Sequence, residues 1–63
     1  MKVIAYQIVE STDMLIVDLK NNTVERQDTE GTILWREMFL DGKLLANYVE
    51  GLISEGTLYG SIM

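Results

Sequence analysis

The complete absence of cysteine and histidine is the feature that most limits what this chain can fold into. A domain of 63 residues buries only about 60% of the surface that its unfolded form exposes, so it is marginally stable without help. Disulfides and thiolate metal sites need cysteine, and histidine is the commonest metal ligand. Oligomerisation is the remaining source of stability. We therefore expect residues 1–63 to form one domain that associates with a second copy, most simply as a dimer.

The apolar content points the same way. Apolar residues make up 48% of the chain and the mean hydropathy is +0.10, which is high for a small soluble domain. We expect part of this apolar surface to lie against another chain. No apolar run approaches the roughly 20 residues that cross a bilayer. The N-terminal run is interrupted by Gln7 and ends at Glu10, so it does not fit a signal peptide. The composition predicts a cytoplasmic protein that does not enter membranes.

The net charge is −5, from ten acidic and five basic residues spread along the chain. Proteins that bind nucleic acid normally carry a basic stripe that neutralises phosphates. Anionic membrane surfaces attract clusters of lysine and arginine for the same reason. Neither partner is expected here.

The first half of the chain has the pattern of antiparallel strands. Residues 3–9 are apolar on both alternating faces, and residues 14–19 place Leu15, Val17 and Leu19 on one face. Residues 23–28 contain a single apolar side chain, which is typical of a solvent-facing edge strand. The Asn21-Asn22 pair favours a two-residue hairpin turn between the second and third of these strands. These segments predict a three-stranded meander.

Residues 29–40 permit two interpretations. A turn closed by Gly31 would launch a fourth strand at Thr32. Alternatively, Thr32 would cap a helix. The apolar residues from Ile33 to Leu40 fit neither period, because they occupy both faces of a strand and most of a helix. We favour the helix, because the polar third strand is typical of a sheet edge, beside which no fourth strand would pair.

Residues 42–55 give the clearest signal in the sequence. Their apolar residues recur at the spacing of one helical stripe: Leu44, Leu45, Tyr48, Val49, Leu52 and Ile53. Asp41 is suited to cap the start of this helix, and Gly56 to take the left-handed conformation after its end. Residues 57–63 alternate weakly and form either a short edge strand or a tail that docks on a partner. The fold class is therefore α+β, with a meander of three or four strands before an amphipathic helix.

The sequence lacks the residues that most catalysis requires. The five glycines match neither phosphate-binding loop pattern. Without cysteine and histidine, only acids, hydroxyls and lysines remain as reactive groups. Carboxylates lie near one another at Asp13 and Asp18, and again at Glu37 and Asp41, but a solvated polar face accounts for such pairs. We therefore expect no enzyme activity, no cofactor and no metal.

Large apolar and aromatic side chains are the best candidates for a binding site, because such residue types are enriched at the centres of interfaces. The predicted protein interface comprises Trp35, Met38, Phe39, Tyr48 and Val49. A second candidate is an acidic face that mimics nucleic-acid phosphates or simply maintains solubility. Its members are Glu30, Glu37, Asp41, Glu50 and Glu55.

Two functions remain after these exclusions. The first is a small acidic interaction module, an inhibitor, adaptor or regulator that binds a larger protein. In its compactness, acidity and lack of catalytic residues the chain resembles, in kind only, small accessory proteins of phages and mobile elements. The alternative is a small dimeric DNA-binding transcription regulator. That function would require Lys2, Lys20, Arg26, Arg36 and Lys43 to converge across a dimer.

Overall fold

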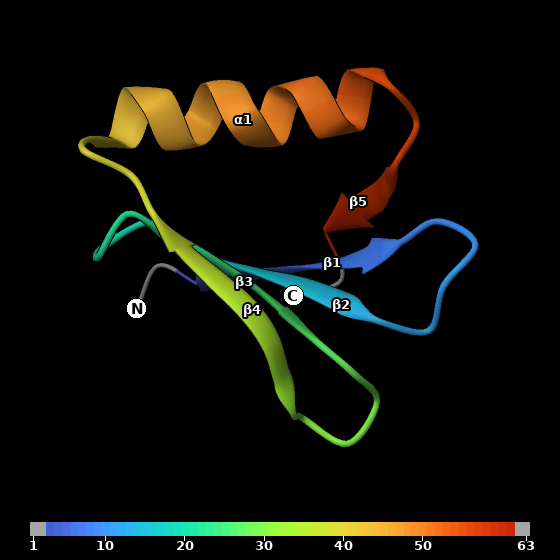
Figure 1. The fold of residues 1–63 in the computed structure, drawn as a ribbon. Coiled ribbons are helices and arrows are strands. Elements are labelled where there is room, and N and C mark those ends of the chain that lie inside the picture. Colours follow the sequence, from blue (N-terminus) through green and yellow to red (C-terminus); the bar gives the residue numbers. More distant parts are fainter. Residues whose placement is uncertain (1–2, 62–63) are drawn as a thin grey trace.

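The computed structural model describes residues 3–61 as one five-stranded sheet with a helix packed on it (Figure 1). All strand pairs are antiparallel, and the strand order is β4-β3-β2-β1-β5. The elements, in chain order, are β1 (Val3–Ile8), β2 (Met14–Asp18), β3 (Thr23–Gln27), β4 (Ile33–Met38), α1 (Gly42–Ser54) and β5 (Leu58–Ser61). The α+β prediction is confirmed, and the meander before the helix has four strands.

The turn between β2 and β3 is longer than its sequence predicts. Asp18 pairs directly with Thr23, so four residues, 19–22, connect the two strands. The predicted two-residue turn is wrong, since Asn22 has a positive φ of 55° while Asn21 does not. The longer turn is stabilised by the Asp18 carboxylate, which accepts hydrogen bonds from two backbone N–H groups of the turn and from the Asn21 side chain.

Residues 33–38 form a strand, so the favoured helix at this position is wrong. Gly31, with a φ of 86°, donates its N–H to the Asp28 carbonyl, and Asp28 donates to the Thr32 carbonyl. This glycine-closed turn is the alternative that the sequence offered, and it directs the chain back along β3. β3 is consequently an interior strand, not the edge that its polarity predicted. Two of its charged side chains pair with neighbouring segments, Glu25 with Arg36 on β4 and Arg26 with Asp13 beside β2, while Val24 is fully buried.

The helix α1 has the predicted boundaries to within a residue, because both of its caps are encoded locally. The Asp41 side chain accepts a hydrogen bond from the Leu44 N–H at the start. At the end, Gly56 has a φ of 76° and donates to Ile53, and Thr57 donates to Leu52. These two bonds form a Schellman motif, which satisfies the last carbonyls of the helix.

The helix joins the two edges of the sheet. It begins beside the β2–β3 turn, where Phe39 donates to Asn22, and it ends beside the β1–β2 turn, where Val9 donates to Thr57. Thirteen helical residues extend about 20 Å, and five strands are about 19 Å wide. One helix is therefore long enough to cross the sheet and deliver β5 to the far side of β1. Of the two alternatives for the tail, the short edge strand is therefore correct for Leu58–Ser61, and residues 62 and 63 lie outside the described part.

The core lies between α1 and one face of the sheet. Its buried members are Ile8, Leu15, Val17, Val24, Leu45, Val49 and Leu58, with Tyr6, Phe39, Tyr48 and Leu52 packed against them. The twist of the sheet carries the β3–β4 hairpin away from the helix (Figure 1). β4 is therefore left without cover, and all six of its residues are exposed. Within residues 3–61, no helix has the length and apolarity needed to span a membrane.

Candidate functional site

The structure divides the five predicted interface residues into two groups. Val49 is only 7% exposed and belongs to the core. Phe39 and Tyr48 are half-buried and pack against the same core, with their ring centroids 5.3 Å apart. Trp35 and Met38 are exposed on β4. The first group packs α1 and the segment before it against the sheet, whereas the second group is exposed to solvent on β4.

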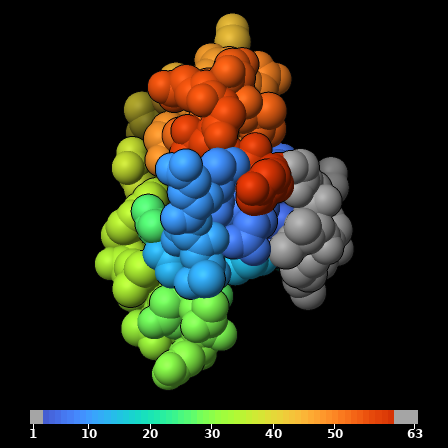
Figure 2. All heavy atoms as spheres, turned by 90° about the vertical axis from the view of Figure 1, so that its right-hand side faces the viewer, coloured from blue at the N-terminus to red at the C-terminus, as the bar shows by residue number. Residues whose placement is uncertain are grey.

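Trp35 and Met38 belong to a larger apolar area that the sequence pattern did not separate from the core. We call it the β4 surface, and its members are Ile33, Leu34, Trp35, Met38 and Leu40. Their exposed fractions run from 38% for Trp35 to 75% for Met38 and 93% for Leu40. In Figure 2, the yellow-green atoms of β4 and the segment after it form one flank of the molecule. The dense apolar run was visible in the sequence, but its exposure depends on where β4 lies in the sheet.

The backbone of β4 also has unpaired groups along its outer side. Phe39 donates its N–H to the Asn22 carbonyl at 2.8 Å, which makes these two residues a hydrogen-bonded pair. Bonded and non-bonded pairs alternate along an antiparallel ladder. The N–H and C=O groups of Arg36 and Met38 therefore point away from β3. Because β4 is an edge of the described sheet, these groups face solvent.

The five acids of the predicted acidic face are spread over the molecule. Glu30 lies in the β3–β4 turn, at the other end of β4 from Asp41, a separation of about 20 Å along a six-residue strand. Glu50 and Glu55 are five positions apart, which turns their side chains about 140° from one another around a helix. Asp41 uses its carboxylate to cap α1. Glu37 lies near Tyr48, and burial together with this charge raises the pKa of the Tyr48 phenol above 10.0.

The acids that remain near β4 nevertheless give that flank a negative balance. Residues 28–41 contain four acids against Arg36 alone. Arg36 is itself paired with Glu25 at 3.3 Å on the neighbouring strand. The apolar β4 surface is therefore bordered by uncompensated carboxylates.

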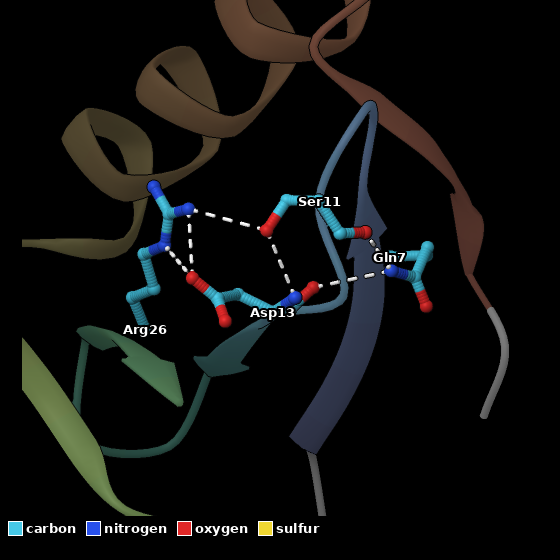
Figure 3. Close-up of polar contacts among 4 residues, drawn as sticks. All are labelled: Gln7, Ser11, Asp13 and Arg26. Carbon is cyan, nitrogen blue, oxygen red and sulfur yellow. Dashed lines mark hydrogen bonds and ion pairs between the residues drawn. The ribbon is translucent and has the colours of Figure 1, made fainter. Parts of the chain in front are cut away.

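The carboxylates that the sequence grouped as pairs have structural roles at separate places. Asp13 lies at the start of β2 and accepts from Arg26 Nε at 2.8 Å (Figure 3). Ser11 and Gln7 complete this network, since the Ser11 hydroxyl accepts from the Asp13 N–H and Gln7 donates to the Ser11 carbonyl. The network ties the β1–β2 turn to β3. Asp18 lies at the other end of β2, where hydrogen bonds from the Asn21 side chain and backbone lower the pKa of its carboxyl below 3.8.

The four basic residues that the structure describes do not form a common surface. Arg26 and Arg36 are each bound to a carboxylate, and Arg26 lies on the helix side of the sheet whereas Arg36 lies on the other side. Lys20 is in the β2–β3 turn and Lys43 is in the first turn of α1. Lys2 lies outside the described residues. Among residues 3–61, no three acidic side chains come together as a group that could hold a metal ion.

No known protein family, curated protein or solved structure matches this chain.

Proposed function

We propose that this chain is a non-catalytic interaction module that binds a larger protein by accepting an extended segment of it along the free edge of β4. Such a module would act by binding alone, as an inhibitor, adaptor or regulator. The observation that carries this proposal is that β4 is an edge strand exposed on both faces, with large apolar side chains and unpaired backbone groups.

Strand addition accounts for both properties of β4 at once. Exposed strand edges are normally protected by charge, bulges or short length, because they readily pair with other chains. β4 has a bulge near Leu34 and charges at Arg36 and Glu37, but Ile33, Trp35 and Met38 remain open around them. In peptide recognition by strand addition, the main chain supplies affinity and alternate side chains supply specificity.

The negative charge around β4 favours a partner segment that carries positive charge. The carboxylates of Glu30, Glu37 and Asp41 form no ion pair with any described residue, and the whole chain carries −5. A matching segment would alternate apolar side chains with lysine or arginine. Such complementarity favours rapid association and discriminates against acidic partners.

A second copy of the chain is the competing occupant, as the composition predicted a homodimer. Antiparallel pairing of β4 with itself places a two-fold axis through the pair, so one residue faces its own copy. If the axis passed through Arg36 or Glu37, that residue would lie opposite the same residue of the second copy. Two like charges would then face each other, which destabilises a cross-strand pair. An axis at Trp35 avoids this conflict. Self-pairing would also bring together two chains of charge −5. Repulsion between like charges therefore favours a basic partner over a second copy.

Site-specific photo-crosslinking tests the proposal in the cells that produce the protein. Benzoylphenylalanine replaces Met38 on β4 or, as the control, exposed Glu55 at the end of α1. The expected result is a covalent complex from position 38 alone, with the linkage mapped to an extended basic segment of another protein. A linkage only to a second copy, or equal yields from both positions, would contradict the proposal.

Two variants at Met38 separate backbone pairing from side-chain packing. Met38→Pro removes an N–H that points away from β3, so the sheet itself keeps its hydrogen bonds. Met38→Ala keeps this N–H and shortens the side chain. We expect the proline variant to lose capture of the mapped partner by about tenfold or more, and the alanine variant to lose less. Equal losses would indicate packing without strand addition.

A further inference from the structure

A second binding feature lies on the other side of α1 from the Phe39–Tyr48 contact. It is an open groove of about 310 Å³ between the helix and the β1–β2 hairpin. We call it the α1 groove, and it is lined by Ile4, Tyr6, Val17, Leu19, Leu45, Ala46, Val49, Glu50 and Ile53. Ala46 and Tyr48 are two positions apart, which separates them by about 200° around the helix. The lining of the groove also shares no residue with the β4 surface, so the two features are separate.

The α1 groove arises from the path of the helix and from one small side chain. The helix begins at the β4 edge, so it leaves uncovered the start of β1, which carries Ile4, and Leu19 directly after β2. Leu45 and Val49 close the floor of the groove, being 0% and 7% exposed. Ala46 contributes only a methyl group beside them, where a larger residue would fill the space. Leu19 and Ile53 remain on the rims with 41% and 45% of their surface exposed.

The polar groups of the α1 groove define the charge of its occupant. Among the described residues that line it, Glu50 alone is charged, and it forms no ion pair or hydrogen bond with any described residue. Glu50 is four positions after Ala46, so its carboxylate lies over the same side of the helix. The Tyr6 hydroxyl is likewise without a hydrogen bond to any part of the chain that the structure describes. The apolar lining suits an apolar side chain of a ligand. The free carboxylate of Glu50 at the rim suits a positively charged group next to that side chain.

We infer that the α1 groove is a docking site for a segment of a partner protein that inserts one large apolar side chain and places an adjacent lysine or arginine against Glu50. The volume of the groove is near the lower limit for small-molecule sites, about 300 Å³, and the groove is partly open to solvent. Both properties fit a side chain that remains attached to a peptide. Anchors of this kind, seated in a pocket beside a charged contact, dominate the affinity of many interfaces.

Nuclear magnetic resonance with three capped dipeptides tests this inference on the full chain. The probes are N-acetyl-Phe-Lys-amide, N-acetyl-Phe-Glu-amide and N-acetyl-Ala-Lys-amide, added to protein labelled with nitrogen-15. We expect the Phe-Lys probe to shift the amides of Ala46, Glu50 and Ile53 saturably, with a dissociation constant of about 1–10 mM. The Phe-Glu probe should bind about fivefold more weakly, the effect of one solvent-exposed ion pair. The Ala-Lys probe should give no saturable shift.

Two variants make the outcome specific to the groove. Glu50→Gln should remove the preference for Phe-Lys over Phe-Glu, while retaining the apolar contribution of the phenyl ring. Ala46→Leu fills the hollow with another strong helix former, so it should abolish binding without loss of helix. Far-UV circular dichroism and thermal unfolding verify that both variants fold.

Three results would overturn the inference. Equal binding of the Phe-Lys and Phe-Glu probes would mean that Glu50 does not discriminate between a positive and a negative neighbour of the phenyl group. Unchanged binding by folded Ala46→Leu would place the probe elsewhere. Shifts of the groove amides that follow protein concentration, without any probe, would identify a second copy as the occupant. Met38→Pro should bind the Phe-Lys probe normally, so failure at the β4 surface and failure at the groove are distinguishable.

Discussion

The Arg26 guanidinium donates from Nε to the Asp13 carboxylate at 2.8 Å, although the two residues are thirteen positions apart in the chain. Asp13 is held on its other side by the Ser11 turn, so this contact joins the β1–β2 turn to β3. Both side chains are partly shielded from solvent, with 34% exposure for Arg26 and 18% for Asp13. Partial shielding strengthens a charged hydrogen bond relative to one in open water.

A double-mutant cycle on Asp13→Ala and Arg26→Ala should show this coupling. We expect each single variant to lower the free energy of unfolding by about 1–2 kcal/mol, with a coupling energy near 1 kcal/mol in urea denaturation. The control is the Glu25–Arg36 pair, which is longer at 3.3 Å and has 56% of Arg36 exposed. Its coupling should be below about 0.5 kcal/mol, and equal coupling energies would argue against a special role for the Asp13 network.

Met38 and Phe39 are neighbours in sequence with opposite environments, and alanine variants should separate them. Met38 is 75% exposed on β4, whereas Phe39 packs against the core and Tyr48. Met38→Ala should change the free energy of unfolding by less than about 0.5 kcal/mol. Phe39→Ala should cost about 2–4 kcal/mol, enough to unfold much of so small a domain. Similar thermal melting curves for the two variants would contradict the assignment of Phe39 to the core.

Gly51 and Gly56 should respond to alanine in opposite directions. Gly51 lies inside α1, and an added Cβ there meets no atom within 4 Å. Gly51→Ala should therefore stabilise the protein by about 0.5–1 kcal/mol, because alanine loses less entropy in a helix. Gly56 has a φ of 76°, in the left-handed region that disfavours side chains. Gly56→Ala should cost about 1 kcal/mol in chemical denaturation, and stabilisation by both variants would exclude the Schellman geometry.

The pKa of Asp18 predicts how the β2–β3 turn responds to acid. Its folded pKa is lowered from 3.8 by hydrogen bonds from Asn21 and Lys20, with the Asn21 side chain the largest cause. The folded state therefore favours the charged carboxylate, and this contribution to stability is complete above the unfolded pKa. It disappears as the pH falls through the lowered folded pKa.

Asp18→Asn should consequently flatten the pH dependence of stability below about pH 4 and leave its shape near pH 7 unchanged. Thermal unfolding between pH 2 and pH 7 measures this difference, and carbon-13 shifts of the Asp18 carboxyl give its pKa directly. A titration midpoint above 3.8 would show that the hydrogen bonds of the turn do not act as described.

The sequence alone was sufficient for the helix and its caps, which depend on near neighbours, but not for the length of the β2–β3 turn. The apolar stripe of residues 42–55, the Asp41 cap and the Gly56 terminus identify α1, because helical hydrogen bonds and caps join residues at most five positions apart. The strands of the first two hairpins follow from alternation and from turn residues. The glycine-closed turn before β4 was also visible at Gly31, although the helical alternative was favoured over it.

Tertiary structure decided the features that depend on which strand lies beside which. Residues 33–38 are apolar on both faces, so no local period identifies them, and only pairing with β3 makes them a strand. The same pairing makes β3 interior and β4 the edge. Likewise, Val49 and Trp35 are similar candidates in sequence, but the helix buries the first while the twist of the sheet leaves the second exposed. Burial is a property of the assembled layers, and this is the physical reason why the candidate binding surfaces could not be separated from the core by sequence.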